Sequence, residues 1–174
     1  IAWSTSRKSL SAHHSNSVVP AALLQTLCDD IKRHRLSLRK TNAPDHVSNR
    51  FIKDGPYDPF VRQLIFSRKD GKKALFFTYS AHATCLSSKF MGLSGDYPKF
   101  LTQNLENRDY DFALYAAGTV GSHRPMVKGN TPEKVQEYAA SLDSAIWLRM
   151  TQFATINSPR ILQSRLDIGL REPH

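Results

Sequence analysis

Cysteine is scarce in this sequence, which has two cysteines, Cys28 and Cys85, among 174 residues. They form no CxxC pair and no dense framework, so a disulfide-stapled scaffold is excluded, and we expect both thiols to be reduced and buried. Apolar runs long enough to cross a membrane are also missing. The chain begins at Ile1, without an initiator methionine or a signal-peptide pattern, and we therefore expect a processed or internal segment.

Acidic residues are outnumbered by basic ones: the sequence has 15 Asp and Glu and 24 Lys and Arg, which gives a formal net charge of +9. A positive surface attracts phosphate, anionic lipid headgroups or an acidic partner, and charge alone does not distinguish them. Nucleic acid is not the partner that we expect, because the sequence has no RNP-like aromatic signature, zinc-finger spacing or Walker loop. The length and a hydrophobic fraction of 40% predict one domain over residues 1–174.

The first half of the chain predicts a helix and then a β-hairpin. Residues 20–35 (PAALLQTLCDDIKRHR) begin with a proline, end with basic residues and carry one apolar stripe, which is typical of an amphipathic helix. Residues 60–67 and 73–80 are β-rich, and the Asp70-Gly71 pair between them is a strong hairpin signal. We therefore expect a buried antiparallel pair of strands.

A short helix and a short strand follow. Asp96 and Pro98 introduce a helix over residues 99–107 (KFLTQNLEN), and residues 111–117 (DFALYAA) predict a buried strand. The strand runs into a loop with two glycines, GTVGSHRP.

The last part of the chain predicts a second long helix. Thr131 is a suitable N-cap, Pro132 occupies the first turn, and apolar positions of residues 131–153 recur at helical spacing as far as Met150. The tail at 161–170 alternates enough to form a last strand. This order of elements predicts an α/β fold, a mixed sheet flanked by amphipathic helices.

Three polar segments lie at the ends of these elements, at residues 11–17, 80–85 and 118–125, where they could converge on a site. They contain four histidines: His13, His14, His82 and His123. Each one alone is most simply a surface or hydrogen-bonded histidine, because no HExxH or other short-range ligand spacing accompanies them.

Five motifs in order make residues 49–125 resemble the N-terminal catalytic domain of the neutral or alkaline, non-lysosomal ceramidases and their bacterial homologues. The motifs are an Asn-Arg pair at 49–50, GPYDP at 55–59, FFTYSAHATCLSS at 76–88, LSGDYP at 93–98 and FALYAAGTVGSHRP at 112–125. SAHHS at 11–15 resembles an earlier histidine motif of the same family.

The resemblance implies a zinc-dependent hydrolase of ceramide or a related lipid amide. It carries two metal ligands onto this chain, His13 (or His14) and His82. If His13 is the ligand, the resemblance implies that His14 contacts substrate or supports a ligand from the second coordination shell. Arg50 matches an arginine that faces the pocket, where its fork of donors suits a substrate oxygen, with Asn49 beside it. Zinc chemistry suits this reaction, because the metal polarises a carbonyl and lowers the pKa of water.

The chain departs from the family pattern in two places. Arg124 stands where the ceramidases have a serine important for activity, and Ser122, two residues earlier, is the candidate catalytic serine that remains. The glutamate and tyrosine that complete the family's zinc site lie further downstream than His174, so we expect this segment to be part of a longer protein. The resemblance implies that this protein is secreted or periplasmic. Oligomeric state is not predicted.

A second interpretation keeps the same scaffold without catalysis. Because arginine cannot act as a nucleophile but binds phosphate and carboxylate well, Arg124 also suits a binding module for an anionic lipid headgroup or a glycan, with an anionic membrane surface as a possible partner.

Local structural roles compete with each of these assignments. LSGDYP predicts a loop and helix cap in which Asp96 accepts backbone N–H bonds. GTVGSHRP could be a turn that needs positive φ at Gly118 and Gly121. Arg50 could be a solvated cation at a strand end, and Cys85 could be a third metal ligand, although a buried thiol suits it better.

Overall fold

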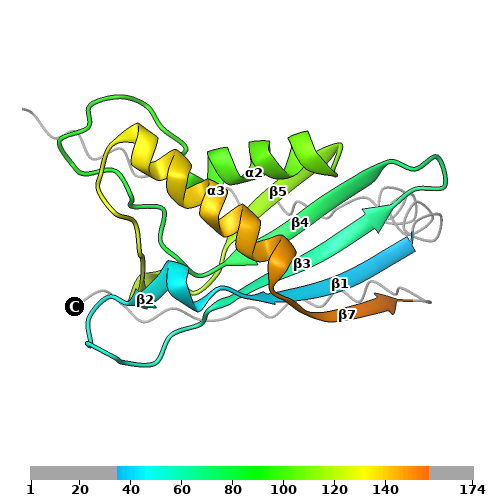
Figure 1. Cartoon of the computed structure of the whole chain (residues 1–174), viewed down its shortest axis with the longest axis horizontal. Coiled ribbons are helices and arrows are strands. Elements are labelled where there is room, and N and C mark those ends of the chain that lie inside the picture. The colour runs from blue at the N-terminus through cyan, green and yellow to red at the C-terminus, as the bar shows by residue number, and fades with distance from the viewer. Residues whose placement is uncertain (1–34, 157–174) are drawn as a thin grey trace, which may run out of the picture.

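The computed structural model describes residues 35–156, which form a mixed α/β structure around a five-stranded sheet (Figure 1). The strand order is β5-β4-β3-β1-β7. Its strands are β1 (Arg35–Asn42), β3 (Phe60–Ser67), β4 (Lys73–Tyr79), β5 (Phe112–Ala117) and β7 (Met150–Ile156). All neighbouring pairs are antiparallel except β4 and β5, which run parallel. The expected mixed sheet is therefore confirmed.

The predicted hairpin is also confirmed, as β3 and β4 pair in register up to Ser67 and Lys73. The turn between them closes with a backbone bond of 2.8 Å from the N–H of Arg68 to the oxygen of Lys72. Gly71 takes a φ of +88°, which a residue with a side chain rarely adopts, so the Asp-Gly signal acts here through glycine's backbone freedom.

Two helices, α2 (Asp96–Arg108) and α3 (Pro132–Leu148), cover one face of the sheet (Figure 1). Their apolar stripes pack on alternate strand residues. The largest of these buried side chains are Val61, Leu75, Phe77 and Tyr79 of the sheet with Tyr97, Leu101, Leu105, Val135 and Leu142 of the helices. An ion pair of 2.7 Å between Arg108 and Asp143 joins α2 to α3. The side chain of Thr131 caps α3, as its sequence predicts.

A small two-stranded ribbon lies at one end of the sheet. It pairs β2 (Val47–Asn49) with β6 (His123–Pro125), and short 3-10 helices precede each strand, η1 (Pro44–His46) and η2 (Val120–Ser122). Because β1, β4 and β5 run in the same direction, all three end beside this ribbon (Figure 1).

The structure corrects two of the expected boundaries. The long helix ends at Leu148, and Met150 begins β7, because MTQFATI also has the β-branched and aromatic pattern of a strand, which pairs with β1. Arg35, expected at a helix end, is the first residue of β1. β1 escaped prediction because its residues toward the helices, Ser37, Arg39 and Thr41, are polar and give no apolar alternation.

The strand expected at 111–117 is present as β5, but it lies at the edge of the sheet and leaves Phe112 and Leu114 exposed. Residues 20–34 of the helix expected over 20–35, the expected strand over 161–170 and the polar segment at 11–17 lie outside the described residues. Within the described part of the chain, no helix is long and apolar enough to cross a membrane.

Candidate functional site

The end of β4 gathers all five of the motifs named above. After Tyr79, the last residue of β4, the chain continues through Ser80 and Ala81 to His82. Side chains from the GPYDP, GTVGSHRP and LSGDYP segments bond to this stretch, and the Asn-Arg pair joins the same network through η2. The expected convergence of residues 80–85 with 118–125 is thus confirmed.

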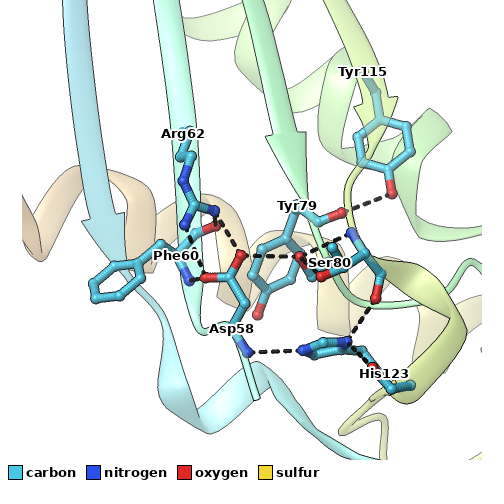
Figure 2. A network of polar contacts seen from close by, with 9 residues as sticks. Asp58, Phe60, Arg62, Tyr79, Ser80, Tyr115 and His123 are labelled. Carbon is cyan, nitrogen blue, oxygen red and sulfur yellow. Dashed lines mark hydrogen bonds and ion pairs between the residues drawn. The ribbon is translucent and has the colours of Figure 1, made fainter. Parts of the chain in front are cut away.

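Ser80 is the centre of this network (Figure 2). Its buried hydroxyl donates to Asp58 Oδ2 at 3.1 Å and accepts from the backbone N–H and the hydroxyl of Thr119, at 3.3 and 3.1 Å. A serine hydroxyl has one donor and two acceptor positions, so Ser80 is fully used in holding two loops to the end of β4. It has no capacity left for a catalytic role.

Asp58 also binds Arg62 through two hydrogen bonds, of 2.6 and 3.3 Å (Figure 2). Burial opposes ionisation of this carboxyl, but the hydrogen bonds and the positive charge of Arg62 outweigh burial and lower its pKa. Asp58 is therefore an ionised anchor for the GPYDP turn, and its carboxylate has no proton to donate at neutral pH.

His123 fixes the same two loops from the other side (Figure 2). Its Nε2 accepts the backbone N–H of Asp58 at 2.8 Å, so the ring proton must lie on Nδ1, which donates to the oxygen of Thr119 at 2.6 Å. Both ring nitrogens of this buried histidine are engaged. It is a structural residue, since neither nitrogen remains to bind a metal or accept a proton.

Ser122, expected to be catalytic, is half-buried in η2, and its Oγ lies 3.1 Å from His123 Nδ1. Because Nδ1 already carries the ring proton, His123 cannot take the proton of Ser122. Arg124 is exposed on β6 and donates from Nε to Ser48 Oγ at 3.0 Å. No ion pair joins its guanidinium to a carboxylate among the described residues.

Asn49 shapes the loop that follows β2. Its Oδ1 accepts the N–H groups of Phe51 and Ile52, both at 2.9 Å, and its Nδ2 donates to the oxygen of Pro56 at 2.8 Å. One amide N–H remains for a ligand. The backbone N–H of Arg50 donates to the oxygen of Ser122 at 2.9 Å. The side chain of Arg50 is exposed, and its Cζ lies 5.4 Å from the centroid of the Phe51 ring.

Asp96 and Tyr97 hold the loop that carries His82. Asp96 Oδ2 accepts the N–H groups of Cys85 and Leu86, at 3.0 and 3.1 Å, and Oδ1 accepts that of Tyr97 at 2.7 Å. Asp96 has a φ of +51°, an uncommon backbone conformation that these three bonds maintain. Asp96 therefore accepts backbone N–H bonds, as expected, but the expected helix cap was wrong, because the N-cap residue of α2 is Gly95 and no side chain caps the helix.

Cys85 and Gly118 both have structural roles near the end of β4. Cys85 is buried, and burial raises the pKa of its thiol, which opposes the thiolate form that zinc requires. Gly118 and Gly121 do not have positive φ, so the expected reason for glycine was wrong. A Cβ on Gly118 would lie 2.7 Å from Ser80 Oγ, and close approach to β4 is what requires glycine there.

His82 lies half-buried beyond the end of β4, and none of the described hydrogen bonds uses its imidazole. Its chemistry fits that of one zinc ligand. The described residues contain no group of three or more His, Cys, Asp and Glu that could hold a metal, so they do not form a complete centre. His13 and His14, the other expected contributors, lie outside the described residues.

Sequence reasoning missed Asp58, Ser80 and Thr119 as the residues that join the loops. The sequence signals for these residues were weak: Asp58 lies in the GPYDP turn, and Ser80 lies two residues before His82. Hydrogen bonds over 22 and 39 residues of sequence separation cannot be read from local patterns.

The fold and the loops at the end of β4 define an α/β protein with its candidate site at strand ends. No known family profile matches the sequence, and no curated protein matches it either. In structure, the chain is similar to neutral ceramidase from Pseudomonas aeruginosa, with a TM-score of 0.55 and 16% identity. A second structure, a ceramidase complexed with C2, gives a TM-score of 0.56 at 16% identity.

Each match covers 67% of this chain and 22% of the ceramidase chain. The described residues therefore have the fold of part of a neutral ceramidase, as the motifs indicated, and the matched region spans about a fifth of that protein's length. At this identity the likeness shows the fold alone.

Proposed function

We propose that this chain contributes to a zinc-dependent amide hydrolase of the neutral ceramidase type, which acts on an N-acyl sphingoid or related lipid amide. The observation that supports the proposal is the position of His82 in a ceramidase-like fold, at the end of β4, where all five motifs meet. Ser80, His123 and the Asp96-Tyr97 pair hold that strand end in place.

In this proposal His82 is one metal ligand, and His13 or His14 is a second. Zinc, when bound, would polarise the amide carbonyl and lower the pKa of a water molecule. The exposed guanidinium of Arg50 would bind a substrate oxygen, and Asn49 would donate its remaining amide N–H. Ser122 would act only as a hydrogen-bonding group, because His123 cannot activate it.

Zinc affinity tests this proposal without relying on turnover. We would measure zinc binding by competition with a chromophoric chelator for the 174-residue chain and for His82→Ala, His13→Ala, His14→Ala and His174→Ala. We expect His82→Ala and one of the His13 and His14 variants to weaken binding by at least about tenfold, while His174→Ala does not. No zinc binding by the parent chain, or equal affinity in His82→Ala and His174→Ala, would overturn the zinc assignment.

The exposed Arg124 supports a second candidate, a non-catalytic module that binds an anionic headgroup or glycan. Ser48 holds Nε of Arg124, and the other two guanidinium nitrogens can bind a phosphate. This candidate predicts a preference for ceramide phosphate over neutral ceramide that is lost in Arg124→Ser. If both proteins bind the two lipids equally, Arg124 is not part of the site.

A further inference from the structure

Two loops carry most of the large apolar side chains that the described part of the chain exposes. Of the eleven such residues, six lie in residues 50–57 and 87–95: Phe51, Ile52, Tyr57, Phe90, Met91 and Leu93. Scattered exposed apolar residues are ordinary, but a concentration in two loops indicates an interaction surface.

The first loop is an ordered turn that points apolar side chains outward. Asn49 accepts the N–H groups of Phe51 and Ile52, and the N–H of Gly55 donates to the oxygen of Ile52 at 3.1 Å. Despite this order, Phe51 is 73% exposed and Ile52 is 61% exposed. Arg50 and Lys53 flank them directly, so the loop presents two apolar residues between two cations.

The second loop repeats this combination. Phe90 follows Lys89, Met91 is 92% exposed, and Leu93 is fully exposed. A backbone bond at its start, from the N–H of Phe90 to the oxygen of Ser87 at 3.0 Å, gives this loop a defined turn as well.

Both loops project at the same end of the long axis of the molecule, the end at which β4 finishes (Figure 1). The turn between β3 and β4 lies at the opposite end (Figure 1). Within residues 50–57 and 87–95, the cations Arg50, Lys53 and Lys89 outnumber the one acid, Asp54. An apolar tip with flanking positive charge therefore marks this end of the molecule.

We propose that these two loops, residues 50–57 and 87–95, bind the surface of an anionic phospholipid membrane. Phe51, Ile52, Met91 and Leu93 enter the boundary between headgroups and acyl chains, while the flanking Lys and Arg side chains contact anionic headgroups. The positive charge around the apolar tips favours a lipid surface over a second copy of this chain, which also has a net charge of +9.

The surface does not depend on zinc, so it goes beyond the proposed hydrolase activity. His82 lies at the base of the 81–95 segment that contains the second loop. If the chain acts on a lipid amide, membrane binding by these loops places His82 on the side from which that substrate arrives.

Vesicle co-sedimentation of the 174-residue chain tests the proposal. The probes are phosphatidylcholine vesicles with and without about 30% phosphatidylserine, at about 0.1 M and 0.5 M salt.

Two double variants remove apolar side chains from the loops: Phe51→Ser with Ile52→Ser, and Met91→Ser with Leu93→Ser. Leu148→Ser is their control, since Leu148 is 83% exposed on α3. The charge variant is Lys53→Gln with Lys89→Gln, and its control is Lys69→Gln with Lys72→Gln, which makes the same change in the turn between β3 and β4.

We expect binding that requires phosphatidylserine and weakens at high salt. Each apolar double variant should lower the affinity for the vesicles by roughly tenfold. The charge variant should lower it by roughly fivefold for each of its two lysines, while the control variants match the parent. Three results would overturn the proposal: no binding by the parent, equal loss in Lys69→Gln with Lys72→Gln, or a concentration-dependent dimer in ultracentrifugation that Phe51→Ser with Ile52→Ser abolishes. The last result would assign the loops to an interface between copies.

Discussion

Tyr97 donates its phenolic proton to the backbone oxygen of Ala81, at 2.6 Å, one residue before His82. Asp96 holds the same segment on the other side of His82, through the N–H groups of Cys85 and Leu86. Two consecutive residues at the start of α2 therefore fix the chain on both sides of the proposed ligand. Tyr97 is fully buried, and burial raises the pKa of its phenol, so it keeps the proton it donates.

Tyr97→Phe removes this bond and leaves the ring in place. We expect the variant to lose about 0.5–1.5 kcal/mol in the free energy of unfolding, as for one buried hydrogen bond. We also expect the imidazole resonances of His82 to shift in NMR spectra of the metal-free protein and zinc to bind more weakly, because the segment around His82 is released.

Tyr138→Phe is the matched control for Tyr97→Phe. Tyr138 is also buried and donates to a backbone oxygen at 2.6 Å, but that oxygen belongs to His46. We expect a similar or smaller loss of stability, since the N–H of Met126 still reaches the same oxygen. Unchanged His82 resonances in Tyr97→Phe, or equal changes in both variants, would contradict a specific role of Tyr97 in positioning His82.

Gly118→Ala tests the close approach of the 118–123 segment to β4. The added methyl group would lie 2.7 Å from Ser80 Oγ and 3.3 Å from the backbone of Tyr79, and because backbone cannot move aside cheaply we expect a loss of about 1–3 kcal/mol in urea unfolding. Gly121→Ala has open space around the new Cβ and should leave stability unchanged or slightly increased. Equal stability of the two variants would mean that this contact does not constrain the fold.

These contacts show why the sequence predicts the elements better than the site. The hairpin and the two helices follow from local signals, Asp70-Gly71, Asp96 with Pro98, and Thr131, which act within a few residues. β1 was missed because its face toward the helices carries Ser37, Arg39 and Thr41 instead of an apolar series.

The site depends on bonds between residues far apart in sequence. The motifs indicated which segments form the site. They did not indicate that both ring nitrogens of His123 are hydrogen-bonded, whereas none of the described hydrogen bonds uses the imidazole of His82. That difference comes from the backbone N–H of Asp58, 65 residues away from His123, and no local pattern contains it.

His46 predicts a dependence of stability on pH. Burial lowers the pKa of this imidazole, and Arg149 lowers it further, while nearby Asp45 acts in the opposite direction. The unfolded chain therefore takes up a proton at a higher pH than the folded protein does. The stability that neutral His46 contributes is present above about pH 6.5 and is lost as the pH falls below that value.

We expect the free energy of unfolding of the parent to fall between about pH 7 and pH 5, and to fall less in His46→Gln. Urea titrations at both pH values measure this, and the difference between the two proteins removes the contribution of the other histidines. His46 Nε2 lies 2.9 Å from Ser141 Oγ, so His46→Gln also lowers stability at pH 7. The same slope in both proteins would show that His46 does not titrate on unfolding.

The 174-residue chain should be inactive as an amidase by itself. The described residues hold no group of three metal-binding side chains, and the resemblance to the ceramidases proposes only His82 and His13 (or His14) as ligands in this sequence. Catalytic zinc sites usually have three protein ligands, and a metal on two histidines lacks the fixed geometry that the reaction needs. Neither His123 nor Cys85 is suited to complete the site, because His123 has both ring nitrogens bonded and burial raises the pKa of the Cys85 thiol.

We would assay the chain on a fluorogenic ceramide with zinc supplied, beside His82→Ala and a sample without protein. All three should give the same rate, even under conditions in which the parent chain binds zinc and His82→Ala does not. Zinc-dependent turnover by the parent that His82→Ala abolishes would contradict this prediction and would require further ligands within the chain. Turnover that persists in His82→Ala would instead place the reaction at a different site.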